Sequence, residues 1–119
     1  FRRVLFRSIF RFLYYCGARV GEVLAIRNSD VNMQEGFVIL KETKNRKHRL
    51  IPLNGQMKEV LCTYMHYRDK MPLASSAGPD SFLFVNHRGE QISRTAVYTR
   101  FMRGSIWHRY GSLWRYYMK

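Results

Sequence analysis

The sequence has few acidic residues and few cysteines. Its 8 Asp and Glu stand against 21 Lys and Arg, which gives a formal net charge of +13. Self-repulsion on this scale is usually offset by a polyanionic partner, so nucleic acid is the first candidate. The 2 cysteines, Cys16 and Cys62, match neither a C-x-x-C zinc spacing nor a disulfide framework. We therefore expect no metal site, and a reducing compartment, the cytoplasm.

Long apolar runs are also missing. No stretch approaches the roughly 20 apolar residues that a membrane-spanning helix needs, and arginines interrupt the N-terminal region too often for a signal peptide. A basic protein that lies on a membrane surface would need a cationic amphipathic helix, whereas the basic residues here cluster around a strand hairpin. The chain has 119 residues, of which 46% are hydrophobic, enough for one compact domain.

The two ends of the chain differ in character from its middle. The chain begins at Phe1, and residues 2–8 read R-R-V-L-F-R-S, which looks like the translation of a sequencing adapter. We expect residues 1–8 to be a non-native scar, residues 9–103 to form part of a catalytic domain, and residues 104–119 to be an uncertain tail. Four aromatic residues of that tail recur at helical spacing: Trp107, Tyr110, Trp114 and Tyr117.

The middle of the chain alternates helical and extended patterns. Apolar residues at helical spacing predict helices at 9–14, 20–26, 56–70 and 93–102. Short β-prone runs predict strands at 37–40, 49–53 and 82–85, the first two joined as an antiparallel hairpin with a long tip. Residues 71–81 are expected to form a loop. This order indicates an α+β fold, mainly α, with helices packed around a small antiparallel sheet.

Residues 16–31 carry the clearest candidate for chemistry. They read C-G-A-R-V-G-E-V-L-A-I-R-N-S-D-V, so Arg19 stands at a glycine-marked turn and Glu22 follows three positions later. A planar guanidinium offers paired donors in a fixed fork, which suits the non-bridging oxygens of a phosphate. Arg19 is therefore a candidate phosphate ligand at the entrance of a helix.

The hairpin supplies a second candidate. Residues 41–53 read K-E-T-K-N-R-K-H-R-L-I-P-L. An ammonium group is a compact proton donor whose pKa falls when it is partly desolvated beside other cations, and Lys44 stands among four of them. The residues that we expect to contact a DNA backbone are Lys41, Thr43, Arg46, Lys47 and Arg49. The same charges could instead protect an edge hairpin from aggregation.

Together these two motifs resemble the catalytic domain of the tyrosine recombinases, the phage integrase family, over most of residues 12–102. The resemblance implies that Arg19 binds the scissile phosphate and that Glu22 is a structural support. It further implies that Lys44 is the general acid toward the leaving 5′ oxygen, with Lys41 as the alternative. Members of this family cut double-stranded DNA without a metal or cofactor, through a 3′-phosphotyrosine, and the intact parent is expected to self-associate on DNA.

The sequence departs from the family pattern after residue 102. The resemblance requires an H-x-x-R box and a late nucleophilic tyrosine, but His108 and Arg109 are adjacent, and Tyr110, Tyr116 and Tyr117 come too early. We expect a truncated catalytic domain that cannot cleave DNA on its own. The alternative hypothesis is a basic DNA-binding module without an enzymatic role.

Overall fold

The computed structural model describes residues 1–42, 47–71 and 78–103. Thr43, Lys44 and Arg46, and the predicted tail from residue 104 on, lie outside these ranges. The described elements are α1 (Arg2–Cys16), α2 (Val20–Leu24), the 3-10 turn η1 (Asn28–Asp30), β1 (Val31–Asn32), β2 (Phe37–Glu42), β3 (Lys47–Pro52), α3 (Gly55–Asp69) and α4 (Arg94–Arg103). The predicted class, mainly α with a small antiparallel sheet, is confirmed.

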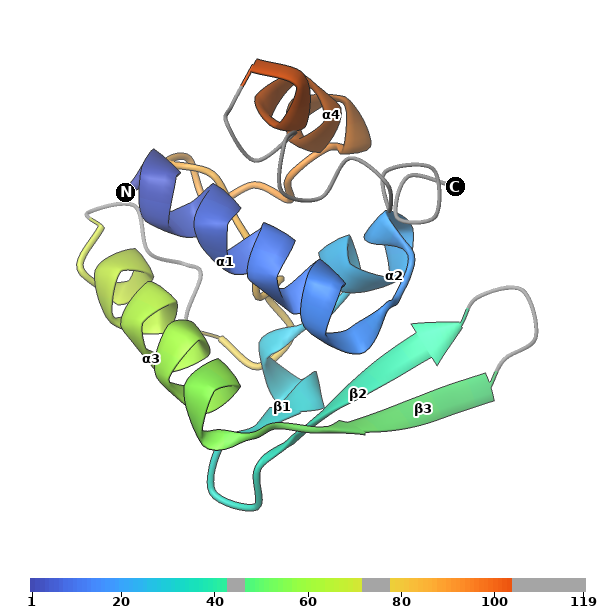
Figure 1. The fold of residues 1–119 in the computed structure, drawn as a ribbon. Helices are drawn as coiled ribbons and strands as arrows, with labels where there is room; N and C mark the ends of the chain where they lie inside the picture. The colour runs from blue at the N-terminus through green and yellow to red at the C-terminus, as the bar shows by residue number, and fades with distance from the viewer. Residues whose placement is uncertain (43–46, 72–77, 104–119) are drawn as a thin grey trace.

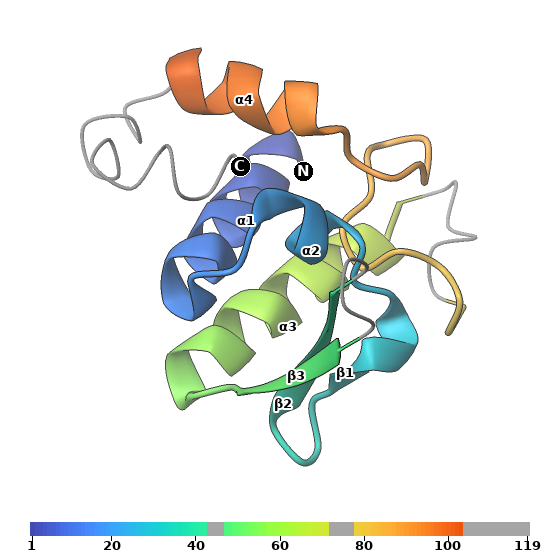
Figure 2. The same ribbon diagram turned by 90° about the vertical axis from the view of Figure 1, so that its right-hand side faces the viewer.

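Helix α1 runs through the middle of the molecule, with α3 along one side and α4 on the other (Figure 1; Figure 2). The prediction placed its start at residue 9, which was wrong, because Leu5 and Phe6 extend the buried stripe by two turns. The helix ends where Gly17 takes a φ of 63° and donates its N–H to the carbonyl of Leu13 at 2.9 Å. A positive φ favours glycine, which explains the sharp stop.

The sheet is antiparallel, in the order β1-β2-β3, and was only partly predicted. The hairpin strands are longer than expected toward the tip, since Glu42 still pairs with Lys47. The two-residue strand β1, in which Val31 pairs with Val38, is too short to leave a periodic signal. Strand β2 buries Val38 and Leu40 against the helices, whereas β3 is an edge strand with mostly exposed side chains.

The predicted strand at 82–85 is not a strand of this sheet. Phe82 and Val85 form only isolated bridges, with Arg27 and Gln91. Side chains of α3 hold the segment instead. The Tyr64 hydroxyl donates to the carbonyl of Leu83 at 2.9 Å and accepts from the N–H of Val85 at 3.0 Å. A buried backbone must find partners, and a tyrosine supplies them here in place of a neighbouring strand.

The same burial predicts a loss of stability at high pH. Burial raises the pKa of Tyr64 from 10.0 to about 12 and that of the Cys16 thiol from 9.0 to about 11. The folded chain therefore holds these protons at a pH where the unfolded chain has lost them. The contribution of these two protonated groups to the free energy of unfolding is complete below pH 9. It is lost as the pH rises through 12, and Tyr64 alone accounts for about 3 kcal/mol of the loss.

Urea unfolding followed between pH 8 and pH 12 measures this loss. The variant Tyr64→Phe should be less stable than the wild type at pH 8 but should lose less stability above pH 10. The matched control is Tyr67→Phe, which removes a hydroxyl from the exposed face of the same helix. Equal pH dependence in Tyr64→Phe and in the wild type would contradict the assignment to Tyr64.

Candidate functional site

The backbone of Arg19 is held in place by its neighbours, while its side chain lies in solvent. It immediately precedes α2 with φ −73° and ψ 149°, between Ala18 at 1% exposure and Val20 at 0%. The two neighbours fix the backbone because both are buried in the core. Among residues 1–42, 47–71 and 78–103, no acidic side chain forms an ion pair with the Arg19 guanidinium. An exposed, unneutralised guanidinium on a fixed backbone can bind an anion from solution.

Glu22 connects the backbone at the start of α2 to the hairpin. One carboxylate oxygen accepts from the backbone N–H of Arg19 at 3.1 Å, and the other accepts from Nη2 of Arg49 at 3.2 Å. The Glu22 side chain is 13% exposed, so these contacts are partly shielded from water. The first contact is the reciprocal half of a capping box, which fixes the start of α2. Glu22 thereby holds Arg19 and β3 together.

The register of the sheet assigns its basic residues to two faces. Arg49 pairs with the buried Leu40, so both side chains lie on the face that α2 covers, and Lys47, two residues away, lies on that face as well. Lys41 follows Leu40 and therefore lies on the other face. Helix α2 lies beside the end of β2 that leads into the hairpin tip (Figure 1).

Lys41 is engaged by a buried acid. Its ammonium lies 3.1 Å from Oδ1 of Asp30, a residue that is only 5% exposed. The other oxygen of Asp30 accepts from the backbone N–H of Arg27 at 3.0 Å. A buried carboxylate needs such partners, and Lys41 neutralises the charge of Asp30 in η1. Of the two lysines considered as general acids, Lys41 thus has a structural partner, and Lys44 lies outside the described residues.

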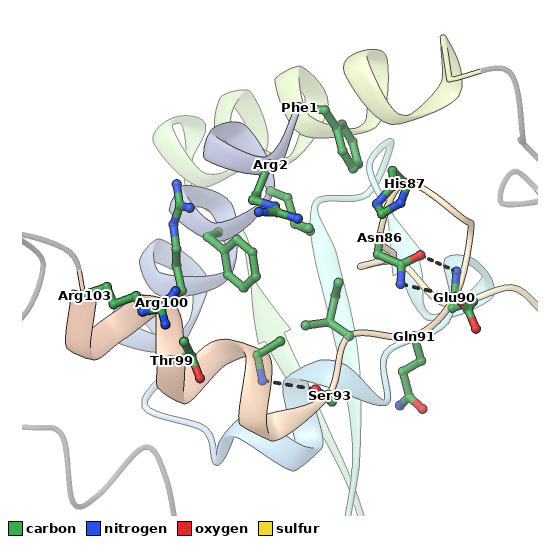
Figure 3. A pocket seen from close by; sticks show the side chains of 14 residues that line it. Phe1, Arg2, Asn86, His87, Glu90, Gln91, Ser93, Thr99, Arg100 and Arg103 are labelled. Carbon is green, nitrogen blue, oxygen red and sulfur yellow. Dashed lines mark hydrogen bonds between the residues drawn. The ribbon is translucent and has the colours of Figure 1, made fainter.

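A separate cavity lies between α1 and the chain that leads into α4. Its volume is about 900 Å³, and Arg2, His87, Arg100 and Arg103 are among its lining residues (Figure 3). None of the predicted site residues that the structure describes lines this cavity. The described basic residues Arg19, Lys47 and Arg49 are instead exposed at the surface, where a polymer backbone can reach them.

The described part of the chain contains neither a metal site nor a membrane-spanning helix. No group of three or more His, Cys, Asp or Glu residues there could hold a metal ion. No helix in the same ranges is both long enough and apolar enough to span a bilayer.

Comparison with known proteins gives consistent results. Residues 3–107 match the model of the phage integrase family. A putative integrase/recombinase, y4rE, of Sinorhizobium fredii is 35% identical over 81 residues, which are 68% of this chain and 25% of that protein. The tyrosine recombinase XerC of Chlorobaculum tepidum is 38% identical over 89 residues, which are 72% of this chain and 26% of that protein.

A solved structure matches the fold. The crystal structure of XerA recombinase superposes with a TM-score of 0.63 at 24% identity, covering 79% of this chain and 32% of that chain. The chain thus spans about a quarter to a third of the length of the proteins it matches. Since the family model covers most of the sequence, the chain belongs to the phage integrase family of tyrosine recombinases.

Proposed function

We propose that this chain provides the phosphate-binding part of a DNA strand-exchange site in a site-specific recombinase. The observation that carries the proposal is the Arg19 guanidinium, exposed and without an acidic partner among the described residues, on a backbone fixed by Glu22. Two matched relatives bear the names integrase/recombinase and tyrosine recombinase. The reaction would take place in the cytoplasm on double-stranded DNA, with several copies of the intact recombinase assembled on it.

The proposed chemistry has three parts. A tyrosine oxygen attacks the phosphorus, the bond to the 5′ oxygen breaks, and that oxygen receives a proton. Arg19 would bind the non-bridging oxygens, whose charge grows in the transition state. Lys44 would donate the proton to the leaving oxygen. The tyrosine and an H-x-x-R box would come from the rest of the recombinase, so this chain alone should bind DNA without cutting it.

The contacts of Lys41 favour Lys44 as the proton donor. A general acid must reach the leaving oxygen, which lies next to the phosphate that Arg19 binds. Lys41 lies on the opposite face of the sheet from Arg49 and pairs with the buried Asp30. Moving its ammonium to a phosphate would leave that carboxylate buried without its partner, at a high free-energy cost.

The remaining basic residues of the hairpin would contact the DNA backbone. Lys47 and Arg49 are exposed on β3, and Thr43 and Arg46 belong to the tip between the strands. Arg49 would act in two ways, because its guanidinium is also held by Glu22. Contacts of this type fix the position of a protein on DNA without reading its sequence.

Binding of this chain to a duplex of unrelated sequence tests the phosphate role. We expect Arg19→Gln to weaken binding roughly tenfold at low salt and to reduce the slope of log K against log salt by about one. The control is Lys70→Gln, which removes the same charge from the far end of α3, on the opposite side of the molecule from α2 (Figure 1). Equal effects of the two substitutions would refute the proposed role of Arg19.

A further inference from the structure

The guanidinium of Arg94 lies so close to α2 that a side chain at Gly21 would displace it. A Cβ atom built on Gly21 would be 2.3 Å from Nη2 of Arg94 and 3.2 Å from its Cζ. Carbon and nitrogen atoms that are not bonded do not approach so closely. Gly21 is the second residue after Arg19, so the guanidinium of Arg94 rests on the short helix that Arg19 begins.

Two hydrogen bonds anchor the backbone around Arg94. The side chain of Gln91 donates to the carbonyl of Leu24 at 3.0 Å, which ties the chain before α4 to the end of α2. The hydroxyl of Ser93 accepts from the N–H of Ala96 at 3.1 Å and caps α4. Arg94 is the first residue of that helix. Its guanidinium therefore reaches Gly21 from an anchored backbone and not from a free loop.

The charges around α2 are unbalanced. Three arginines lie at this five-residue helix: Arg19 precedes it, Arg49 contacts its one acid, Glu22, and Arg94 contacts Gly21. Both oxygens of Glu22 are already engaged, by the N–H of Arg19 and by Arg49. Within the described ranges no acidic side chain forms an ion pair with Arg94. Like charges near one helix repel one another, and an anion that binds to them lowers this repulsion.

We propose that Arg94 binds a DNA backbone phosphate next to the one bound by Arg19, and that Gly21 sets the position of its guanidinium by having no side chain. This inference rests on the proposed function, because it takes DNA as the anion and Arg19 as its first ligand. Arg94 supplies a second planar fork, which matches phosphate oxygens in a bidentate manner. Two forks on one small helix would fix both the position and the direction of the strand.

Substitution at Gly21 tests this inference without removing any charge. The methyl group of Gly21→Ala should displace the Arg94 guanidinium, which is the flexible end of its side chain, and leave the fold intact. We expect Gly21→Ala and Arg94→Gln each to weaken binding to duplex DNA roughly tenfold. The double variant should be no weaker than Arg94→Gln alone, since both changes remove one contact. The salt slope should fall by about one in each case.

The matched control is Gly55→Ala. It makes the same substitution in a helix, but apart from its chain neighbours and its own helix backbone no described residue has an atom within 4 Å of the added Cβ, so binding should not change. Alanine is the better helix former at both positions, and neither variant should unfold at a lower temperature than the wild type. Arg94→Lys should keep the salt slope but bind more weakly, because it lacks the fork.

The outcomes separate this inference from the proposed function. If Arg19→Gln weakens binding but Gly21→Ala and Arg94→Gln do not, Arg94 has no role in binding DNA, while the function of Arg19 stands. If Arg19→Gln has no effect, the proposed function fails and this inference fails with it. A loss in Arg94→Gln that occurs on one duplex sequence only would also overturn the phosphate assignment, because phosphates are alike in every sequence.

Discussion

Replacing Arg68 by methionine should lower the free energy of unfolding by about 3 kcal/mol, the largest stability effect that we expect from one polar residue. The side chain of Arg68 is only 3% exposed. Its Nη1 donates to the side-chain oxygen of Asn28 at 2.7 Å and to the carbonyl of Leu83 at 3.0 Å. These bonds join α3 to η1 and to the segment that follows residue 78.

The sign of this effect depends on what remains after the substitution. A buried guanidinium costs free energy to desolvate, and a methionine of similar length fills the space without that cost. The Asn28 oxygen and the Leu83 carbonyl each lose a charged donor, however, and although the Tyr64 hydroxyl still donates to Leu83, the loss of two hydrogen bonds from a buried charged donor is costly. The pair with Asp69 adds little, because the Asp69 side chain is 46% exposed. We therefore expect the lost hydrogen bonds to outweigh the gain.

Urea unfolding of Arg68→Met at neutral pH measures the difference. The control is Arg88→Met, which makes the same substitution at an exposed position of the turn before α4. We expect the control to stay within about 0.5 kcal/mol of the wild type, as surface substitutions usually do. If Arg68→Met is as stable as the wild type, desolvation of the guanidinium outweighs its hydrogen bonds.

The Arg68 network also explains why the strand prediction at residues 82–85 failed. Four apolar residues in a row read equally well as a buried strand or as a buried loop, because periodicity reports only the need for burial. Here Tyr64 and Arg68 satisfy the backbone of this segment from α3. No local pattern indicates that a helix elsewhere in the chain will supply those partners. The apolar run at residues 82–85 therefore does not determine which groups its backbone pairs with.

The frame of Arg19 shows what local sequence can predict. A glycine turn, an arginine and a glutamate three positions later specify a helix entrance and its capping contact, because all the partners lie within one turn. The approach of Arg94 to Gly21 has no such signal. It joins residues far apart in the chain, and it depends on the packing of α4 beside α2, which no local pattern specifies.

Within the complete recombinase, Arg19→Ala should slow DNA cleavage by roughly 100-fold to 1000-fold, the scale of losing one preorganised donor at a developing oxyanion. Lys44→Ala should slow it by roughly 100-fold or more, as expected for a general acid. The two losses have different causes, so a modified substrate separates them. Sulfur in place of the bridging 5′ oxygen gives a leaving group that departs without a proton.

With that substrate, Lys44→Ala should regain most of the wild-type rate, whereas Arg19→Ala should not, since the non-bridging oxygens still require their ligand. Lys41→Ala should cleave both substrates within a few-fold of the wild type and should instead lower stability, because it leaves the buried Asp30 without its ion pair. If Lys41→Ala instead cleaves normal DNA slowly and the sulfur-containing substrate at nearly the wild-type rate, Lys41 and not Lys44 is the general acid. Normal cleavage in Arg19→Ala would leave the chain as a DNA-binding module, because the exposed Arg19 guanidinium, whose backbone N–H is held by Glu22, would then bind DNA without acting on the phosphate that breaks.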